Sequence, residues 1–407
     1  MPEIPMNLNY MAFAVPFFLF FIGLEYWFSK RFNRSVFNFN SSIANMNIGV
    51  AERLIDMFTA AGFFFFYDYL HNHFAIFDIQ PTLLMWIALI LSTDLIWYWY
   101  HRMGHKVNLF WGFHVVHHSS EEFNYTAGTR ITFFQAVIRT LFWSVLPIVG
   151  FPASMITIML IVHGLYPFFT HTQLIGKLGI LEYILVTPSH HRVHHASNEA
   201  YLDKNFGDMF IIWDKLFGTF AEEKEEARYG LTKQLDSYSF LWQHFHYLVE
   251  LWYMTKQRQG FWNKVKLVFG RPADLDPYIR AEVEKKFLSR HKVRTRSQKF
   301  RVYVLCQFTV MVTMLFLLLL LEHHTDQFLQ IMSALFILVT LINCGAIMEQ
   351  RRWVFFLELI RGFFLAVTTF YYFPHPTTLV FLSLLTIASL SYFSSLQKHY
   401  LKSIYGR

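Results

Sequence analysis

The stretch HRMGHKVNLFWGFHVVHHSSEEFN, residues 101–124, decides how this chain folds and what it can bind. It holds five histidines, although the sequence around it is strongly apolar. The five are His101, His105, His114, His117 and His118. The first two are spaced i,i+4 and the last three i,i+3,i+4, and residues at these spacings share one face of an α-helix. The stretch therefore predicts two helical segments that each present a row of imidazoles.

The composition predicts a membrane protein. Of the 407 residues, 54% are hydrophobic and 15% are charged, whereas soluble domains carry about 25% charged residues. A bilayer-spanning helix needs about 20 mostly apolar residues, so we expect an all-α integral membrane protein with about nine transmembrane helices. The expected crossings are 12–28, 50–67, 82–101, 131–150, 152–170, 302–321, 329–347, 354–373 and 377–396.

Lys and Arg are distributed unequally between the two sides of these crossings. The connectors without either residue are 1–11, 68–81, 151, 322–328 and 374–376. The connectors on the opposite side contain both residues, as at Lys30, Arg102 and Arg351. Because cytoplasmic loops are enriched in Lys and Arg, we expect the second side to face the cytoplasm. Both the endoplasmic reticulum and a bacterial inner membrane remain open.

More histidines follow beyond the opening stretch. The segment TPSHHRVHHASN, residues 187–198, contains four, and His171 precedes it. Gly150 and Pro152 lie near the middle of the apolar residues 131–170, which predicts two crossings joined by a tight turn. Such a hairpin returns the chain to the face from which it started. All the clustered histidines are therefore expected at one membrane face, the cytoplasmic one.

Repeated HxxHH spacing predicts a metal site. Neutral imidazole is the commonest metal ligand, but it suits iron, zinc, copper and nickel alike, so the spacing does not name the metal. The sequence contains no HExxH and no CxxCH motif, which disfavours a zinc protease and covalently attached haem.

The motifs HRMGH, HVVHH and HRVHH, with one histidine between them, resemble those of the fatty acid hydroxylase superfamily, also called the sterol desaturase type. The strings DLIWYWYHRMGH, LEYILVTPSHHRVHH and IIWDKLFGTF are similar to its alkylglycerol monooxygenase branch. The resemblance covers roughly residues 85–220. It implies nine metal ligands, which are His101, His105, His114, His117, His118, His171, His191, His194 and His195. His190 matches the branch motif as a further metal candidate.

The resemblance also implies a reaction. Members are O2-dependent membrane enzymes with a dinuclear centre, so we expect two iron ions and a lipid substrate. In this branch the carbon beside the ether oxygen of an alkylglycerol is attacked, which releases a fatty aldehyde and a glycerol derivative. The chain has no GxGxxG and no HPGG motif, so electrons are expected from a separate reductase or a diffusible donor such as a tetrahydropterin. Lys106 stands where this branch usually has Glu, so the resemblance does not fix the donor.

Six polar residues near the motifs are candidates for contacts with the ligands, the substrate or the cofactor. Asp94 lies seven residues before His101 on the same predicted helix face, where a carboxylate would fix the tautomer of a ligand imidazole. Helix packing is the alternative for Asp94. The other five candidates are Asn124, Glu182, Asn198, Asp203 and Asn205. Ordinary turn and cap roles are the alternative for these five.

The pattern predicts four regions. They are an N-terminal transmembrane region (1–81), a catalytic domain (82–221), a basic cytoplasmic segment (222–301) and a C-terminal four-helix transmembrane region (302–407). Residues 251–301 hold 14 Lys and Arg against 4 Asp and Glu, as in a solvated loop or a segment that contacts anionic headgroups; no nucleic-acid partner is expected. The remaining alternatives are a fatty acyl, sterol or carotenoid hydroxylase or desaturase, a metal-binding transporter and a non-catalytic lipid-binding protein.

Overall fold

Helices make up the regular structure of this chain. The computed structural model describes residues 8–288 and 298–406. Over these ranges there is no β-strand, and extended segments pair only at two isolated bridges. The prediction of an all-α protein is therefore confirmed for the described residues. The chain divides into two compact units.

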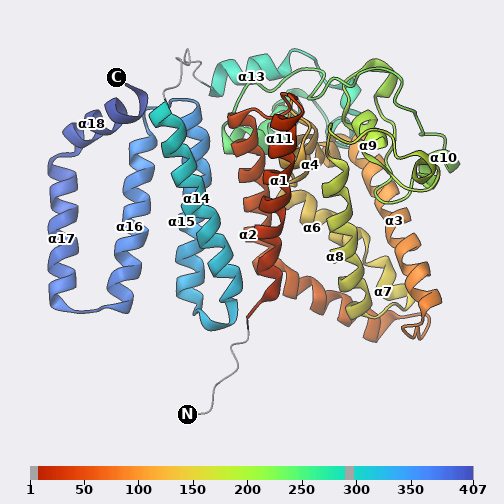
Figure 1. Ribbon diagram of the computed structural model, residues 1–407, viewed down its shortest axis with the longest axis horizontal. Helices are drawn as coiled ribbons and strands as arrows, with labels where there is room; N and C mark the ends of the chain where they lie inside the picture. Colours follow the sequence, from red (N-terminus) through yellow and green to blue (C-terminus); the bar gives the residue numbers. More distant parts are fainter. Residues whose placement is uncertain (1–7, 289–297, 407) are drawn as a thin grey trace, which may run out of the picture. The chain divides into compact units, whose positions relative to one another are not determined.

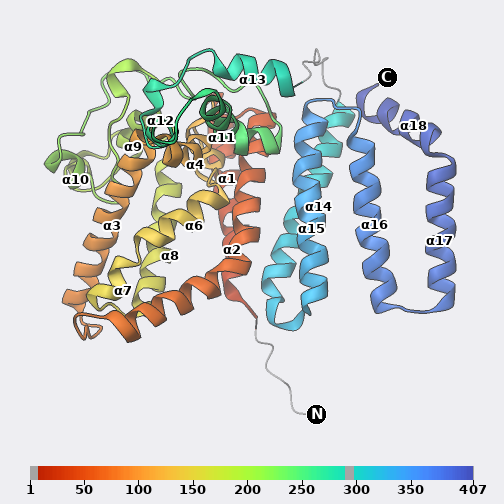
Figure 2. The ribbon, with the colours of Figure 1, turned by 180° about the vertical axis from the view of Figure 1, so that it is seen from behind.

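The first unit, here called the histidine unit, comprises residues 20–236 and 241–288. Its helices are α1 (Ala14–Arg31, from Phe20 onward), α2 (Phe39–Phe74), α3 (Leu83–Lys106), α4 (Asn108–His118), α5 (Tyr125–Gly128), α6 (Phe133–Phe142), α7 (Val145–Val149), α8 (Ala153–Thr170), α9 (Pro188–His195), α10 (Ile212–Leu216), α11 (Phe240–Gln257), α12 (Phe261–Val268) and α13 (Ile279–Phe287). Shorter 3-10 turns lie at Gly179–Tyr183, Glu199–Tyr201 and Pro272–Asp274. The ends of α3 and α8 meet α4 and α9 at one end of this unit (Figures 1 and 2).

The second unit, here called the C-terminal unit, comprises the described residues up to Leu19, Ser237–Phe240 and all described residues from 298 onward. Its elements are η1 (Tyr10–Phe13), α14 (Gln298–Leu320), η5 (Glu322–His324), α15 (Gln327–Met348), α16 (Val354–Tyr372), α17 (Pro376–Ser391) and α18 (Phe393–Tyr405). α17 and α18 are bent against each other by 78°. α18 lies at the same end of this unit as the start of α14 (Figures 1 and 2).

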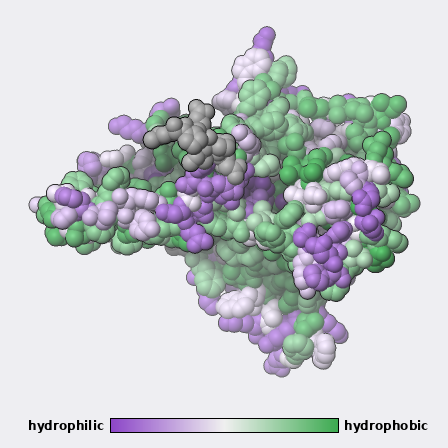
Figure 3. Space-filling model, turned by 90° about the horizontal axis from the view of Figure 1, so that it is seen from below, coloured by the Kyte–Doolittle hydropathy of each residue, from purple (hydrophilic) through white to green (hydrophobic). Residues whose placement is uncertain are grey.

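Six helices in the described residues are long and apolar enough to cross a membrane. They are Tyr10–Arg31, Leu83–Lys106, Ala153–Thr170, Gln298–Leu320, Gln327–Met348 and Val354–Tyr372, and the bent pair α17–α18 would make a seventh if it forms one broken span. Hydrophobic residues cover much of the surface in Figure 3, and Phe65 and Leu83 are 67% and 78% exposed. The chain is therefore a multi-pass membrane protein.

Three of the nine predicted crossings are not among these six helices: 50–67, 131–150 and 377–396, the last of which lies in the bent pair α17–α18. Residues 50–67 lie within α2, which carries Glu52, Arg53 and Asp56. Residues 131–150 form the shorter helices α6 and α7, because the helix is interrupted at Trp143 and Ser144. The count of nine crossings stays a prediction.

A tight turn between α7 and α8 brings the chain back toward the histidines. Gly150 has a φ of 129° there, and a Cβ at this position would lie 2.0 Å from the carbonyl oxygen of Phe77. Only glycine fits such a close backbone contact in the left-handed region. α8 then packs on α3 through Leu89, Trp97 and Ile156. The predicted tight turn between 131 and 170 is present, and α8 brings His171 next to His117 of α4 and His191 of α9.

Candidate metal centre

Nine of the ten predicted metal ligands meet at one end of the histidine unit. The ends of α3 and α8, together with α4 and α9, supply them (Figure 1). Their ligand nitrogens form two groups, and within each group these atoms all lie within 4.8 Å of one another. The first group is His101, His105, His114, His118 and His194, and the second is His117, His171, His191 and His195. Side chains from four separate segments thus converge on two points.

Nitrogen spacings in the first group fit a metal ion. Nε2 of His114 lies 3.0 Å from Nε2 of His101 and 3.1 Å from Nε2 of His118. Two nitrogens bound at about 2.1 Å to one ion and at right angles lie about 3.0 Å apart. Facing nitrogen lone pairs repel each other unless a cation lies between them. The geometry therefore fits imidazoles arranged around an ion.

The second group has the same spacing. Nε2 of His171 lies 3.3 Å from Nε2 of His117 and 3.0 Å from Nε2 of His191. Three further Nε2 atoms of the two groups are buried and have no hydrogen-bond partner among the described residues: those of His105, His194 and His195. Buried polar nitrogens without a partner are costly, and a bound ion would satisfy them.

The outer nitrogens of five ligands donate away from the centre. The Nδ1–H groups of His101, His117, His171 and His194 donate to the carbonyls of Phe206, Arg130, Pro167 and Lys204 respectively, and that of His114 donates to Oε1 of Gln135. A donor bond at Nδ1 fixes the tautomer that leaves Nε2 free to bind a metal. These contacts therefore aim the lone pairs inward.

Burial keeps these imidazoles neutral. Loss of hydration lowers the pKa of His114 to about 3, helped by neighbouring His105, and lowers that of His171 to about 4. Burial also holds the pKa of five others well below the ordinary histidine value: His117, His118, His191, His194 and His195. At neutral pH these rings carry no charge, which is the form that binds metals.

Asp94 holds in place the loop between Tyr201 and Ile212. This loop carries the carbonyls of Lys204 and Phe206, which accept from His194 and His101. The Asp94 carboxylate accepts hydrogen bonds from the backbone N–H groups of Met209 and Phe210 at 2.9 and 3.1 Å, and from Nε1 of Trp213 at 2.9 Å. It also accepts from Nε2 of His163 at 3.0 Å. Asp94 was expected to bond a ligand imidazole. In the structure it positions the loop instead, because its helix face points toward this loop two turns before His101.

His163 is enclosed between two carboxylates. Its Nδ1 lies 3.0 Å from Oδ2 of Asp208, and its Nε2 contacts Asp94. These three residues have ligand atoms close enough to hold an ion. However, Asp94 already accepts four hydrogen bonds and both ring nitrogens of His163 face carboxylates. An imidazolium between two acids accounts for these contacts without a metal.

Asp203 contacts a predicted ligand. One carboxylate oxygen lies 2.5 Å from Nζ of Lys106, and the other lies 3.7 Å from Nδ1 of His105. These contacts hold the pKa of Asp203 at about 2, although partial burial acts in the opposite direction. Lys106 therefore neutralises a carboxylate beside the centre.

The other predicted candidates hold local turns and helix ends and have no hydrogen bond to the side chains of the nine histidines among the described residues. The Asn124 side chain caps α5 by accepting from Thr126 N–H, and Glu182 accepts from Thr187 and Ser189 at the start of α9. Asn198 accepts from Arg228 N–H, and Asn205 donates to the carbonyls of His190 and Ala221. The expected turn and cap roles explain these four.

His190 lies outside both groups. Its Nδ1 accepts from the backbone N–H of Thr187 at 3.3 Å, in a capping arrangement at the first turn of α9. Its carbonyl accepts from Asn205 at 3.1 Å. The structure therefore differs from the prediction that grouped His190 with the ligands, because the ring is used to start the helix that carries the next three histidines.

Sequence reasoning missed three supporting residues. Gln135 accepts from His114; Asp214 accepts from the N–H groups of Phe206 and Gly207, both at 2.7 Å. Glu25 accepts from Tyr125 N–H and from the Thr172 hydroxyl next to His171. Each is a polar residue in an apolar helix or near a loop, but nothing in the local sequence identifies its partner.

Gln135→Leu should weaken metal binding about 10- to 100-fold, the usual effect of removing a residue that orients a ligand. The change leaves the Nδ1–H of buried His114 without an acceptor. Competition with a chelator, followed by elemental analysis, measures the change. Gln135→Glu keeps an acceptor oxygen and should retain most of the affinity. Equal affinity in wild type and Gln135→Leu would show that this contact does not orient His114.

Comparisons with known proteins agree with the sequence resemblance. Residues 86–219 match the fatty acid hydroxylase family. Human alkylglycerol monooxygenase is 31% identical over 88% of this chain and 81% of the human protein, and the Danio rerio enzyme is 30% identical over the same shares. The Xenopus tropicalis alkylglycerol monooxygenase is 34% identical over 65% of this chain and 59% of its own length. No solved structure matches the chain.

The matched region contains both histidine groups, and the similarity to these relatives extends over most of the chain. The predicted resemblance is therefore confirmed. This chain belongs to the alkylglycerol monooxygenase family of membrane-bound, O2-dependent lipid oxygenases and carries its fatty acid hydroxylase region at residues 86–219.

Proposed function

We propose that the chain hydroxylates an alkylglycerol ether lipid at the carbon next to the ether oxygen. One oxygen atom of O2 enters the C–H bond, and the other leaves as water after uptake of two electrons and two protons. The hydroxylated ether then separates into a fatty aldehyde and a glycerol derivative. The observation that carries this proposal is the convergence of nine neutral imidazoles in two groups, in a chain similar to alkylglycerol monooxygenases.

The proposal assigns one iron ion to each histidine group. When bound, the two ions supply the activation of O2 that protein side chains cannot supply by themselves. The chain supplies nine ligands without a negative charge, and the carbonyls of Phe206 and Lys204 fix two of their tautomers. Phe206 and Phe123 are 0% and 1% exposed beside the imidazoles, so they help to exclude water.

The electron source and the orientation also belong to the proposal. Electrons come from a separate reductase or a diffusible donor such as a tetrahydropterin. The centre faces the cytoplasm, which the distribution of Lys and Arg supports. Lys106 and Asp203 form an ion pair with about half of each side chain exposed. Because this pair is accessible beside His105, it is the place where a charged donor would first meet the centre.

The test is turnover of an alkylglycerol under ¹⁸O2 by the detergent-purified, iron-loaded full chain. A reduced tetrahydropterin and a reductase with NADPH are supplied in separate reactions, and the aldehyde is trapped at once by reduction to its alcohol. The proposal predicts ¹⁸O in the trapped alcohol and none in the glycerol product, because the new hydroxyl oxygen becomes the aldehyde oxygen. A matched diacylglycerol should give no product. Label in neither product with either donor, or equal attack on the diacylglycerol, would contradict the proposed substrate.

A further inference from the structure

A cavity of about 770 Å³ lies within the C-terminal unit, between α14, α16, α17 and α18. Its walls are largely apolar, with Val302, Leu359 and Leu396 among the lining residues. Volumes of this size are typical of ligand sites. The cavity belongs to a unit that supplies none of the nine histidines, so the proposed oxygenation does not account for it.

A lysine and a histidine from two helices are basic side chains that an anion would meet at this cavity. Lys299 near the start of α14 and His399 on α18 both line it and are exposed. Neither side chain has a hydrogen bond or an ion pair among the described residues. No Asp or Glu occurs among the described residues that line the cavity. An anionic group would therefore find a cation here and no opposing carboxylate at the wall.

A carboxylate behind the wall is already neutralised. Glu358 accepts from the hydroxyls of Tyr303 and Tyr400, both at 2.8 Å, and its other oxygen accepts from Arg361 at 2.8 Å. The two tyrosines line the cavity, whereas Glu358 and Arg361 do not. This network fixes the tyrosine side chains as a rigid wall and pairs the negative charge that would otherwise oppose an anion.

The cavity lies at the cation-rich end of the C-terminal unit. Arg352 and Arg351, the latter paired with Glu349 at 2.7 Å, lie between α15 and α16 at the end where α14 starts and α18 lies (Figure 1). The connections at the opposite end, 321–326 and 373–375, contain no Lys or Arg. Clusters of basic residues at a membrane face attract anionic lipid headgroups.

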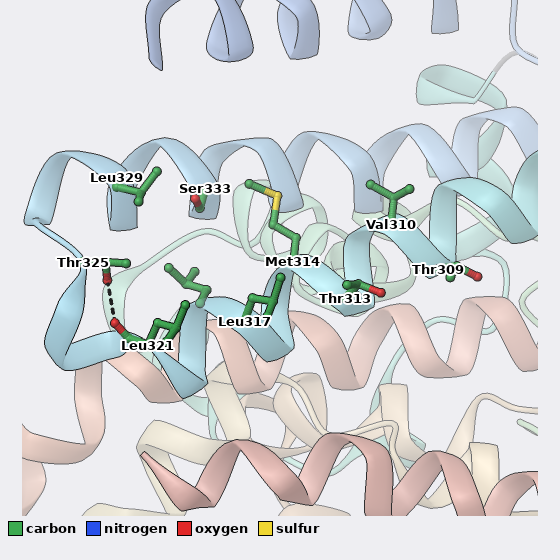
Figure 4. Close-up of a pocket in the computed structure, with 10 residues that line it drawn as sticks. Thr309, Val310, Thr313, Met314, Leu317, Leu321, Thr325, Leu329 and Ser333 are labelled. Carbon is green, nitrogen blue, oxygen red and sulfur yellow. Dashed lines mark hydrogen bonds between the residues drawn. The ribbon is translucent and has the colours of Figure 1, made fainter. Parts of the chain in front are cut away.

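A second cavity in the same unit provides a contrast. It has a volume of about 400 Å³ and lies between α14 and α15. Figure 4 shows Met314, Leu317 and Leu321 between the two helices, with hydroxyl groups such as Thr325 at one end. None of its lining residues is charged. It fits an apolar chain but offers nothing that would select a charged headgroup.

We propose that the cavity between α14, α16, α17 and α18 binds one anionic phospholipid. The phosphate lies between Lys299 and His399, and an acyl chain follows the apolar wall formed by α14 and α16. This site is separate from the proposed oxygenation and does not depend on it.

The test is lipid binding to the detergent-purified full chain, measured by native mass spectrometry with phosphatidic acid, phosphatidylcholine and diacylglycerol of the same acyl chains. Phosphatidic acid should bind most tightly. Lys299→Gln should weaken it about fivefold, the effect of one cation near a headgroup. Lys398→Gln removes the same charge from an exposed residue of α18 that does not line the cavity, and should leave binding unchanged. Equal loss in both variants, or no preference for phosphatidic acid, would overturn the proposal.

A second pair of variants tests the cavity itself without changing charge. Val302→Trp fills the proposed site and should abolish the preference for phosphatidic acid, whereas Leu317→Trp fills the neutral cavity of Figure 4 and should preserve it. Inorganic phosphate should not displace the lipid at millimolar concentration. Displacement by phosphate, or loss of the preference in Leu317→Trp, would contradict a lipid bound between α14 and α18.

Discussion

His194→Ala is expected to lower ether-lipid turnover more than about 100-fold while the protein still inserts and folds. Nε2 of His194 is buried and has no hydrogen-bond partner in the described part of the chain, and its Nδ1 donates to the carbonyl of Lys204. Loss of a residue that only orients a ligand costs about 10- to 100-fold, and loss of the ligand itself should cost more. Turnover of an alkylglycerol by purified protein, with iron content measured on the same sample, checks the result.

His190→Ala is the matched control for this variant. His190 lies on the same helix and is also buried, but it belongs to neither histidine group. Removing its cap contact with Thr187 should cost about 1 kcal/mol of stability and leave the iron in place. Equal loss of turnover and iron in both variants would contradict the ligand assignment, because the helix alone would then explain the effect.

Asp94→Ala is expected to lower the free energy of unfolding by about 3–5 kcal/mol, as is usual when one partner of a buried ion pair is removed. His163 and the N–H groups of Met209, Phe210 and Trp213 would lose their acceptor. The loop that contains Met209 and Phe210 also contains Phe206, whose carbonyl accepts from Nδ1 of His101. Iron retention should therefore fall together with stability. Chemical unfolding in detergent, with and without chelator, measures both effects.

Asp78→Ala provides the comparison for Asp94→Ala. Asp78 is exposed and accepts only from nearby Gln80 among the described residues. Surface substitutions of this kind change stability by about 0.5 kcal/mol or less. A similarly small effect for Asp94→Ala, with unchanged iron retention, would show that the loop is held by other contacts.

Local spacing was enough to predict a metal site, whereas the set of nine ligands followed from the resemblance to the fatty acid hydroxylase superfamily. The i,i+3 and i,i+4 intervals of His114, His117 and His118 fix a common helix face before any tertiary structure is known. The hairpin through Gly150 was also readable, because glycine and proline interrupt an apolar run there. In the structure nine of the ten predicted metal residues lie in two groups, a division that the spacing did not predict.

Hydrogen-bond partners that lie far apart in the sequence could not be predicted from local spacing. Asp94 shares a helix face with His101, which suggested a direct contact, but its acceptor oxygens serve Met209 and Phe210 more than 100 residues away. His190 belongs to an HxxHH-type run, yet the first turn of α9 uses its ring as a cap. Gln135 binds His114 only because α6 packs against α4. Tertiary packing decides each of these roles.

The number of membrane crossings is also not fixed by the local sequence pattern alone. Hydropathy identifies an apolar run, but it does not show whether the run stays one straight helix. Residues 131–150 break into α6 and α7 at Trp143 and Ser144, and residues 377–396 extend into a helix pair bent by 78°.

The central claim is that two groups of neutral imidazoles hold two iron ions. Elemental mass spectrometry of the gently purified full chain, with His194→Ala and His190→Ala prepared in parallel, tests it most directly. The account predicts about two iron ions per chain in wild type and in His190→Ala, and clearly fewer in His194→Ala, since His194 belongs to the first group. One ion or none in wild type, or the same content in all three proteins, would contradict it.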